Sequence, residues 1–259
     1  MQPQTLRVNQ QIVLVTGGAR GLGVEIARSF AREGALVVVN YRRSAEAAAD
    51  LVRELGADRA VALQADVTDD DEVRALVAAA TTHFGAPITT VVNNALADFQ
   101  FDGDARPKPD TITWDRFDAQ LRGAVKATLA TTQAVLPGMR EAGFGRIVNI
   151  GTNLFQHPVV PYHDYTAAKA AALSLTRTLA ADLGADGITV NMVSGGLLRT
   201  TDASSATPEE VFDIIASTTP LRRAINPSEL ADAVLFFASP WARAVTGQNL
   251  IVDGGLVNG

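Results

Sequence analysis

Several residue and segment types are scarce or missing in this chain, and each absence excludes a class of protein. The 259 residues contain no cysteine, which excludes a disulfide scaffold, cysteine-ligated zinc, iron–sulfur clusters and a thiol nucleophile. Basic charge is limited, and the formal net charge is −6, so no basic field exists to collect nucleic acid or an anionic membrane surface. Lysine occurs only at Lys108, Lys126 and Lys169.

Long hydrophobic runs are missing as well. The longest apolar runs, such as Ala233–Ala238, fall far short of the ~20 residues that a membrane-spanning helix needs. The first ten residues contain no apolar stretch of the kind found in signal peptides. No group of Asp, Glu and His residues has the spacing of a metal site. We therefore expect a soluble, cytoplasmic protein with no metal centre and no nucleic-acid or membrane partner.

Short apolar runs alternate with longer segments of helical periodicity along the chain. The runs are continuous, as strands buried on both faces require, and lie at Ile12–Val15, Leu36–Val39, Ala60–Leu63, Ile88–Val92, Ile147–Ile150, Ile188–Val193 and Leu250–Val252. Apolar spacings of three and four predict helices at Val24–Glu33, Ala45–Leu55, Asp70–Phe84, Trp114–Met139, Tyr165–Leu183 and Pro227–Ala238. No linker interrupts the pattern, which predicts one α/β domain over residues 1–259. The expected architecture is a seven-stranded, doubly wound parallel sheet with helices on both faces.

Two segments do not fit this alternation and are expected to be loops. They cover residues 96–110 and Gly195–Leu221, and each follows a predicted strand. Both would leave the carboxyl edge of the sheet, where open α/β folds bind ligands. Loops of this length are usually either functional lids or disordered segments.

A glycine-rich turn follows the first predicted strand and precedes a helix. Gly17, Gly21 and Gly23 lie in the pattern G-x-x-x-G-x-G, with Arg20 and Leu22 between them. Such a turn lets the backbone approach a pyrophosphate and packs the helix closely against the sheet. The free N–H groups and the positive dipole end of the helix then favour phosphate. The turn predicts dinucleotide binding.

The residues at the end of the second strand bear on the choice of cofactor. NAD-specific sites usually place an acidic residue there to hold the ribose 2′-hydroxyl. This chain has Asn40, Tyr41 and Arg42 instead, and Arg20 lies in the glycine turn. Guanidinium groups can bind a 2′-phosphate through two parallel hydrogen bonds. The pattern favours NADP(H) over NAD(H), although Arg42 and its neighbour Arg43 could also be ordinary solvated residues at a helix start.

One tyrosine and one lysine are spaced for catalysis. Tyr165 and Lys169 lie four residues apart on a predicted helix, and therefore on one face of it. With three Tyr and three Lys in the chain, about 0.03 such pairs are expected by chance. A tyrosine ionises near pH 10, and a nearby ammonium favours the phenolate. We expect Lys169 to lower the pKa of Tyr165 towards the working pH of a general acid.

Taken together, the motifs resemble those of the short-chain dehydrogenase/reductase family over essentially the whole chain. They are T-G-G-A-R-G-L-G (16–23), A-D-V (65–67), N-N-A (93–95), Y-T-A-A-K (165–169) and T-G-Q-N-L-I-V-D-G-G (246–255). The sequence is most similar to 3-oxoacyl-acyl-carrier-protein reductases and related carbonyl reductases. The resemblance implies a Rossmann-type fold and an NADP-dependent reductase in which Tyr165 donates a proton to a carbonyl oxygen. Lys169 would also hold the nicotinamide ribose.

The resemblance assigns further positions. Thr152 stands where the family has its catalytic Ser, and Gln120 where it has an Asn that holds a proton-relay water. The remaining implied cofactor contacts are Asp66 and Val67 at the adenine, Asn93 in the central strand, Ala95, Leu96, Gly196, Leu198 and Thr200. Leu96 replaces the usual Gly of N-N-A-G, and Gly195-Gly196 replaces the usual P-G.

The sequence carries less information about substrate and partners. Relatives dock an acidic carrier protein on two basic residues near the active-site entrance, and Gly143 and Asp186 occupy the matching positions here. The expected substrate is a small carbonyl or alcohol compound, with an acyl thioester among the options. An apolar pocket could be lined by Phe99, Phe101, Leu154, Phe155 and Tyr162. The resemblance implies a homotetramer, or a homodimer, formed through the long central helices and the C-terminal strand.

Two alternatives remain open at this point. The first is NAD(P)-dependent oxidation of a secondary alcohol or sugar, because the chemistry is reversible. The second is a cofactor-binding regulatory protein with weak catalysis, which the departures at Gln120, Thr152 and Leu96 motivate.

Overall fold

The computed structural model describes residues 5–96, 99–199, 201 and 203–258. Its strands form one parallel sheet in the order β3-β2-β1-β4-β5-β6-β7. They are β1 (Ile12–Val15), β2 (Leu36–Tyr41), β3 (Ala60–Gln64), β4 (Thr90–Asn93), β5 (Gly145–Thr152), β6 (Ile188–Gly195) and β7 (Asn249–Val252). The predicted seven-stranded, doubly wound sheet is confirmed. The chain reverses its direction of winding between β1 and β4, and their carboxyl ends therefore flank the ligand-binding crevice of such a sheet.

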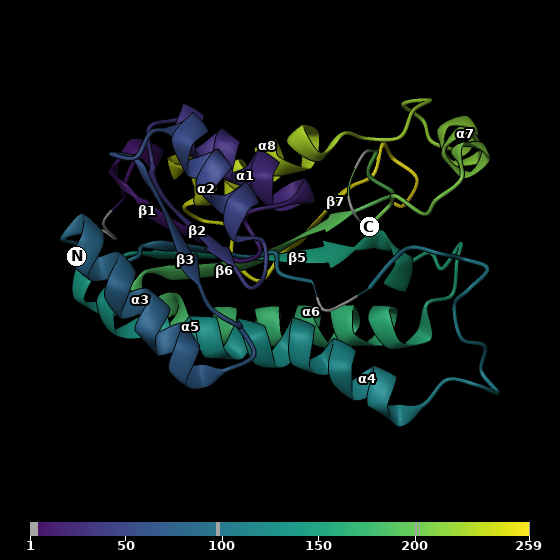
Figure 1. Cartoon of the computed structure of the whole chain (residues 1–259), viewed down its shortest axis with the longest axis horizontal. Helices are drawn as coiled ribbons and strands as arrows, with labels where there is room; N and C mark the ends of the chain where they lie inside the picture. The colour runs from purple at the N-terminus through teal and green to yellow at the C-terminus, as the bar shows by residue number, and fades with distance from the viewer. Residues whose placement is uncertain (1–4, 97–98, 200, 202, 259) are drawn as a thin grey trace.

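Helices cover both faces of the sheet (Figure 1). The α-helices are α1 (Gly21–Arg32), α2 (Ala45–Leu55), α3 (Asp70–Phe84), α4 (Trp114–Leu121), α5 (Ala127–Ala142), α6 (His163–Leu183), α7 (Glu209–Thr218) and α8 (Pro227–Ala238). Short 3₁₀ turns lie at η1 (Val8–Gln10), η3 (Asn153–Phe155), η4 (Gly184–Asp186) and η5 (Pro240–Ala242). Helices α1, α2 and α8 pack on one face, and α3, α5 and α6 on the other.

Each face has its own apolar core. Phe30 of α1 and Leu230 of α8 are fully buried on one face, and Met139 of α5 and Ile147 of β5 on the other. Because the central strands are covered on both sides, every residue of β1 is buried. This double burial is the physical reason for the continuous apolar runs in the sequence.

Helix ends follow local sequence signals. The Asp69 carboxylate caps α3 by accepting hydrogen bonds from the amides of Asp71 and Glu72. Gly85 ends this helix with φ of 70°, a conformation that glycine adopts without strain. Asn226 and Glu229 form a capping box at the start of α8. These signals explain why several helices begin or end where the sequence predicts.

Two predictions of secondary structure need correction. The single helix expected at Trp114–Met139 is divided by a π-helical turn, η2 (Arg122–Lys126), between α4 and α5. The Thr128 hydroxyl donates to the Ala124 carbonyl of this turn at 2.8 Å. The segment Gly195–Leu221, expected to be a loop, contains the ten-residue α7. This helix buries Phe212, and its apolar residues Val211, Ile214 and Ile215 lie at spacings of three and four, so the helical signal was present in the sequence and the expectation of a loop passed over it.

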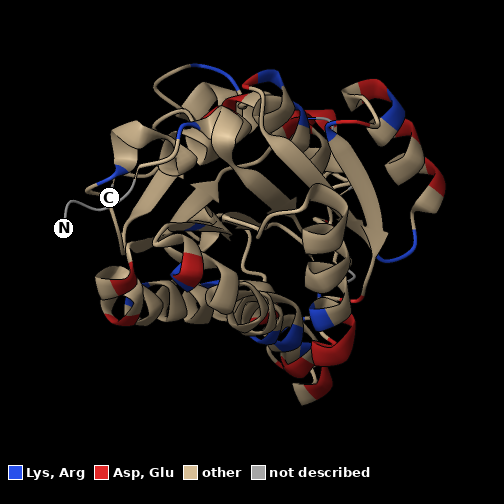
Figure 2. Ribbon diagram, turned by 90° about the vertical axis from the view of Figure 1, so that its left-hand side faces the viewer, with Lys and Arg blue, Asp and Glu red and all other residues tan. Residues whose placement is uncertain are grey.

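Charged residues of both signs are interspersed over the outer helices and loops, while most of the sheet is uncharged (Figure 2). No helix among the described residues is long and apolar enough to cross a membrane.

Candidate active site

The glycine turn lies between β1 and α1 and is shaped for close approach of a ligand. Gly17 and Gly21 have φ of 60° and 52°, a backbone conformation that residues with a Cβ atom rarely adopt. A Cβ on Gly23 would lie 2.3 Å from the Gly17 carbonyl oxygen, so only glycine fits there. Because α1 begins at Gly21, its unpaired N–H groups are available at this turn. The turn has room for a pyrophosphate, and Leu22 lies in the first turn of α1.

Hydrogen bonds of Thr16 and Asn94, which were not among the predicted site residues, connect this turn to the end of β4. The Thr16 hydroxyl accepts hydrogen bonds from the amides of Asn94 (2.9 Å) and Ala95 (3.0 Å). The Asn94 side chain donates to the carbonyls of Thr16 and Gly17. The backbone of Ala95 is therefore held against the turn, where a Cβ on Gly17 would lie 3.0 Å from its Cα.

Asn40 supports the turn from the protein side. It is 2% exposed, its Oδ1 accepts from the Gly17 amide at 3.2 Å, and its Nδ2 donates to the Ala65 carbonyl at 3.1 Å. Its side chain is therefore committed to neighbouring backbone, and any contribution to cofactor binding passes through the turn. Tyr41, the next residue, is half-buried at the end of β2.

Charged residues gather beside β2 and β3. Arg42 forms an ion pair with Asp66, with 3.5 Å between Nη1 and Oδ2. Burial alone would raise the pKa of Asp66, but hydrogen bonds from the Thr68 amide and hydroxyl, together with Arg42, lower it below its usual value. Val67 is buried next to Asp66. Arg20 is the N-cap residue of α1 and is exposed on the same edge. The structure brings these predicted cofactor residues to one edge of the sheet.

The predicted catalytic residues converge at the carboxyl end of β5. Thr152 is the last residue of β5, and Tyr165 and Lys169 lie on the first two turns of α6. The Thr152 hydroxyl lies near enough to the Tyr165 phenol to oppose the effect of burial on the pKa of that phenol. The Lys169 ammonium lies 5.9 Å from the centre of the Tyr165 ring and donates to the Ile150 carbonyl at 2.6 Å. Thr152, Tyr165 and Lys169 are 4%, 5% and 6% exposed, so they meet in a site largely screened from water.

Burial changes the ionisation of this group in a direction opposite to the prediction for Tyr165. Burial raises the pKa of Tyr165 to about 12, which outweighs the opposing effect of the Thr152 hydroxyl. Burial also lowers the pKa of Lys169 to about 8. The expectation that Lys169 brings the pKa of Tyr165 below its usual value is therefore wrong for this structure, because desolvation dominates. The phenol is held in the protonated form that a proton donor requires.

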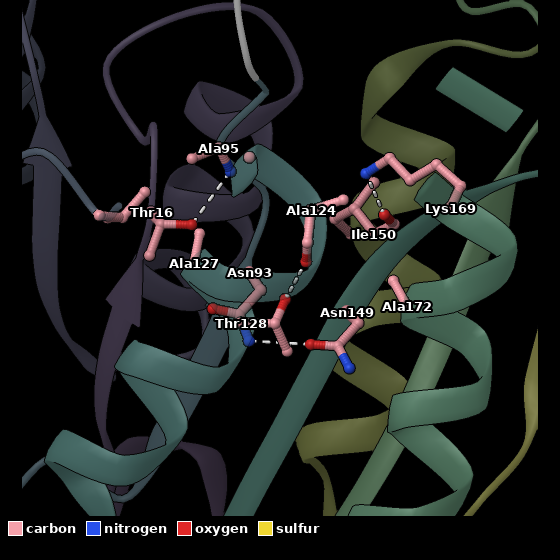
Figure 3. A pocket seen from close by; sticks show the side chains of 12 residues that line it. Thr16, Asn93, Ala95, Ala124, Ala127, Thr128, Asn149, Ile150, Lys169 and Ala172 are labelled. Carbon is pink, nitrogen blue, oxygen red and sulfur yellow. Dashed lines mark hydrogen bonds between the residues drawn. The ribbon is translucent and has the colours of Figure 1, made fainter. Parts of the chain in front are cut away.

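A small cavity separates Lys169 from β4 (Figure 3). It has a volume of about 10 Å³, near the lower limit for one water molecule. Its lining comes from β4, β5, η2, α5, α6 and the segments that follow β1, β3 and β4, and it includes Thr16, Asn93, Thr128, Asn149 and Lys169. Asn93 donates to Asn149 at 2.8 Å, and Asn149 donates to the Thr176 hydroxyl at 2.8 Å, so a chain of side-chain hydrogen bonds joins β4, β5 and α6.

Gln120 and Leu96 lie on the other side of Lys169. Gln120 belongs to the last turn of α4, is 6% exposed, and lines a narrow space together with Leu96, Tyr165 and Lys169. Leu96 is 38% exposed, so its side chain takes up surface at the entrance where a glycine would leave room. Gln120 and Leu96 both depart from the family pattern, and both adjoin Tyr165 and Lys169.

Three further predicted cofactor residues follow β6. Gly196 packs against the end of β7, where a Cβ would lie 2.8 Å from the Cβ of Asp253. Leu198 pairs with Ile225 in an isolated parallel bridge. Thr200 lies outside the described residues. Among the described residues, no cluster of His, Asp or Glu could hold a metal ion.

The two positions matched to carrier-docking residues lie away from this site. Gly143 ends α5 and Asp186 belongs to η4, directly before β5 and β6 begin at Gly145 and Ile188. They therefore lie at the amino edge of the sheet, opposite the end of β5 that carries Thr152. Asp186 forms an ion pair with Arg140 at 2.7 Å.

Comparisons with known proteins support the family that the sequence motifs indicate. Residues 17–257 match a family model described as enoyl-(acyl carrier protein) reductase. The chain is 33% identical to the 7alpha-hydroxysteroid dehydrogenase of Escherichia coli strain K12, covering 96% of this chain and 95% of that protein. It is also 33% identical to the 3-oxoacyl-(acyl-carrier-protein) reductase FabG of Staphylococcus epidermidis, covering 94% and 97%.

A solved structure is similar over nearly the whole fold. It is a blue fluorescent protein from a metagenomic library in complex with NADPH, with a TM-score of 0.85, 35% identity, and coverage of 98% of this chain and 100% of that one. The fold and the site define a Rossmann-type oxidoreductase. The chain belongs to the short-chain dehydrogenase/reductase family.

Proposed function

We propose that the protein reduces a ketone to a secondary alcohol with NADPH as the hydride donor. The observation that carries this proposal is the buried meeting of Thr152, Tyr165 and Lys169 beside the glycine turn. NADPH, when bound, supplies the hydride that reduces the carbonyl carbon. NADPH needs a turn that binds its pyrophosphate, and the reaction needs a proton donor next to the cofactor. The glycine turn and Tyr165 would fill these two roles.

The residues that would hold the cofactor form two groups. The glycine turn and the N-terminus of α1 would bind the pyrophosphate, with Gly17, Gly21 and Gly23 permitting close approach. Arg20 and Arg42 would bind the 2′-phosphate, which favours NADP(H) over NAD(H). Asp66, Val67, Ala95, Leu96, Gly196, Leu198 and Thr200 would border the rest of the cofactor, and Lys169 would hold the nicotinamide ribose.

The chain's own residues then handle the proton and the developing charge. The Thr152 hydroxyl donates to the carbonyl oxygen as negative charge develops there. The Tyr165 phenol, protonated at neutral pH, transfers its proton to that oxygen. With its pKa lowered to about 8, Lys169 is still mostly protonated at pH 7 and stabilises the resulting phenolate. Gln120 would connect Lys169 to water through its side-chain amide.

The substrate is proposed to be a small carbonyl compound. Gly143 and Asp186, the positions matched to carrier-docking residues, lie at the amino edge of the sheet, opposite Thr152, so their charge does not bear on whether a carrier protein docks at this site.

Assembly into a homotetramer is part of the proposal. Trp241 of η5, Leu250 of β7 and Phe236 of α8 are exposed apolar side chains in the C-terminal region, and Leu129 is exposed on α5. Association through these two regions would cover them. Light scattering should give a mass near four times 27.2 kDa.

A titration combined with a substrate panel tests the proposed activity. NADPH should bind more tightly than NADH, and at least one ketone should be reduced. In Tyr165→Phe, cofactor binding should persist while turnover falls about 10²- to 10⁴-fold. Tight NADPH binding without turnover of any ketone would favour the regulatory alternative. Faster oxidation of alcohols or sugars than reduction of ketones at neutral pH would favour the dehydrogenase alternative.

A further inference from the structure

An aromatic side chain covers the proposed proton donor. The rings of Phe99 and Tyr165 lie nearly parallel, with 4.4 Å between their centres and 15° between their planes. Phe101 meets the Tyr165 ring edge-on at 5.5 Å. Tyr162 meets Phe99 and Phe101 edge-on at 5.2 and 5.7 Å. Four aromatic rings therefore form one cluster at the catalytic phenol, in a chain with only 6% aromatic residues.

Both sides of this cluster are anchored. The Phe101 amide donates to the Ala203 carbonyl at 2.9 Å, and the Thr207 hydroxyl donates to the Phe101 carbonyl at 3.1 Å. The segment that carries Phe99 and Phe101 is thus hydrogen-bonded to the segment after β6. On the other side, the Tyr162 carbonyl accepts from the amide and the hydroxyl of Thr166 in α6. The rings form a prearranged wall of the site.

The position of this wall limits what a substrate can contact. A reacting carbonyl oxygen must reach the hydroxyl groups of Tyr165 and Thr152. Because Phe99 lies on the Tyr165 ring, the group attached to that carbonyl must lie next to Phe99 and Phe101. An aromatic ring in the substrate can form offset-stacked or edge-to-face contacts with Phe99 and Phe101. A flexible chain loses conformational freedom on binding and forms no ring–ring contacts in return.

We propose that Phe99 determines specificity and selects ketones whose carbonyl is attached to a flat aromatic ring over saturated or flexible ketones of the same size. This inference rests on the proposed ketone reduction and names the substrate class for it. A flat ring can exchange ring contacts with Phe99 and Phe101 while its carbonyl oxygen reaches the phenol. A saturated ring or acyl chain makes only nonspecific apolar contacts there.

The test compares kcat/KM for acetophenone and cyclohexyl methyl ketone, which differ in the aromaticity of one ring. The ratio of the two values is measured in the wild type and in Phe99→Leu, so that the intrinsic reactivity of each ketone cancels. Phe99→Leu should lower the ratio about 3- to 10-fold, the range expected for loss of one aromatic pair. Phe236→Leu on α8, which packs on the other face of the sheet from α6, should leave the ratio unchanged.

Each outcome bears on the proposal. An unchanged ratio in Phe99→Leu, or an equal fall in Phe236→Leu, would overturn it. If Phe99→Leu does not fold, Phe101→Leu replaces it, and the ratio should fall there too. Turnover of other ketones but of neither test compound would overturn the inference while leaving the proposed function standing. Reduction of no ketone at all, with NADPH bound, would overturn the proposed function and the inference together.

Discussion

The Asn153 side chain donates a hydrogen bond to the Asp253 carboxylate at 2.9 Å, across 100 positions of sequence. The same carboxylate accepts from the amides of Gly255, Leu256 and Val257. Asn153 directly follows Thr152, and both Asn153 and Asp253 are buried. The C-terminal turn is thereby fastened to the end of β5 that carries the proposed oxyanion donor.

The first prediction concerns this pair. Asn153→Ala should lower the free energy of unfolding by about 1–3 kcal/mol, because a buried carboxylate loses one of its donors. It should also reduce kcat, because Thr152 loses its fixed neighbour. Urea unfolding and steady-state kinetics measure the two effects. Gln156→Ala, an exposed position three residues further on, serves as the control and should change neither. Equal effects in both variants would contradict the role given to Asn153.

The second prediction separates the hydroxyl of Thr152 from its methyl group. Thr152→Ser keeps the donor and should retain activity, because only a methyl group is lost. Thr152→Ala removes the donor and should lower kcat about 10²- to 10³-fold with little change in NADPH affinity. Steady-state kinetics and a cofactor titration check both variants. Similar activity in the two variants would show that the hydroxyl plays no part in the reaction.

The third prediction follows from the buried ammonium of Lys169, whose pKa is about 8 in the fold and about 10.4 in an unfolded chain. Between these values the unfolded chain binds more protons than the folded one, so the stability contributed by this group rises with pH. From pH 8 to pH 10 the rise should be about 2 kcal/mol.

The measurement is the free energy of unfolding at several pH values in the wild type and in Lys169→Met, which is similar in length but uncharged. The difference between the two curves should increase across this pH window. Burial raises the pKa of Tyr165 as well, which makes stability fall above pH 10, so the comparison ends there. A difference that stays flat from pH 8 to pH 10 would show that Lys169 keeps an ordinary pKa.

The fourth prediction concerns cofactor choice. Arg42→Ala should raise the Kd for NADPH about 10-fold or more and leave the Kd for NADH nearly unchanged, because only NADPH carries the 2′-phosphate. Fluorescence titration with both cofactors measures the effect. Arg140→Ala, at the amino edge of the sheet, is the matched control. An equal rise in the Kd of both cofactors in Arg42→Ala would show that Arg42 does not act through the 2′-phosphate.

The fifth prediction concerns the glycine turn. Gly23→Ala should abolish measurable NADPH binding, because its Cβ would lie 2.3 Å from the Gly17 carbonyl oxygen and would displace the turn. Gly184→Ala is the matched control, since a Cβ there meets no atom within 4 Å and the backbone is helical. Titration and thermal unfolding of both variants separate loss of the site from loss of the fold. Normal binding by Gly23→Ala would exclude the turn as the phosphate cradle.

Much of the fold could be predicted because its signals are local. Continuous apolar runs mark β1 to β7, and the bounds predicted for β1, α2, α3 and α8 agree with the structure. The π turn at Arg122–Lys126 could not be predicted, because Trp114–Met139 has a helical pattern throughout and hydrogen bonding of the backbone decides where it widens. Helix α7 could have been predicted as well, because Val211, Ile214 and Ile215 follow the helical spacing of three and four.

The sequence by itself determined the parallel sheet, the glycine turn and the spacing of Tyr165 and Lys169. Each depends on neighbouring residues, through burial on both strand faces, a backbone without Cβ atoms, or the helical repeat. Only the tertiary structure decided that Asn40 faces the glycine turn, that Asn153 binds Asp253, and that Phe99 covers Tyr165. It also decided the pKa of Tyr165, because desolvation depends on how many distant residues exclude water from the phenol. The fold buries Lys169, one of only three lysines, beside Tyr165 in the proposed catalytic site.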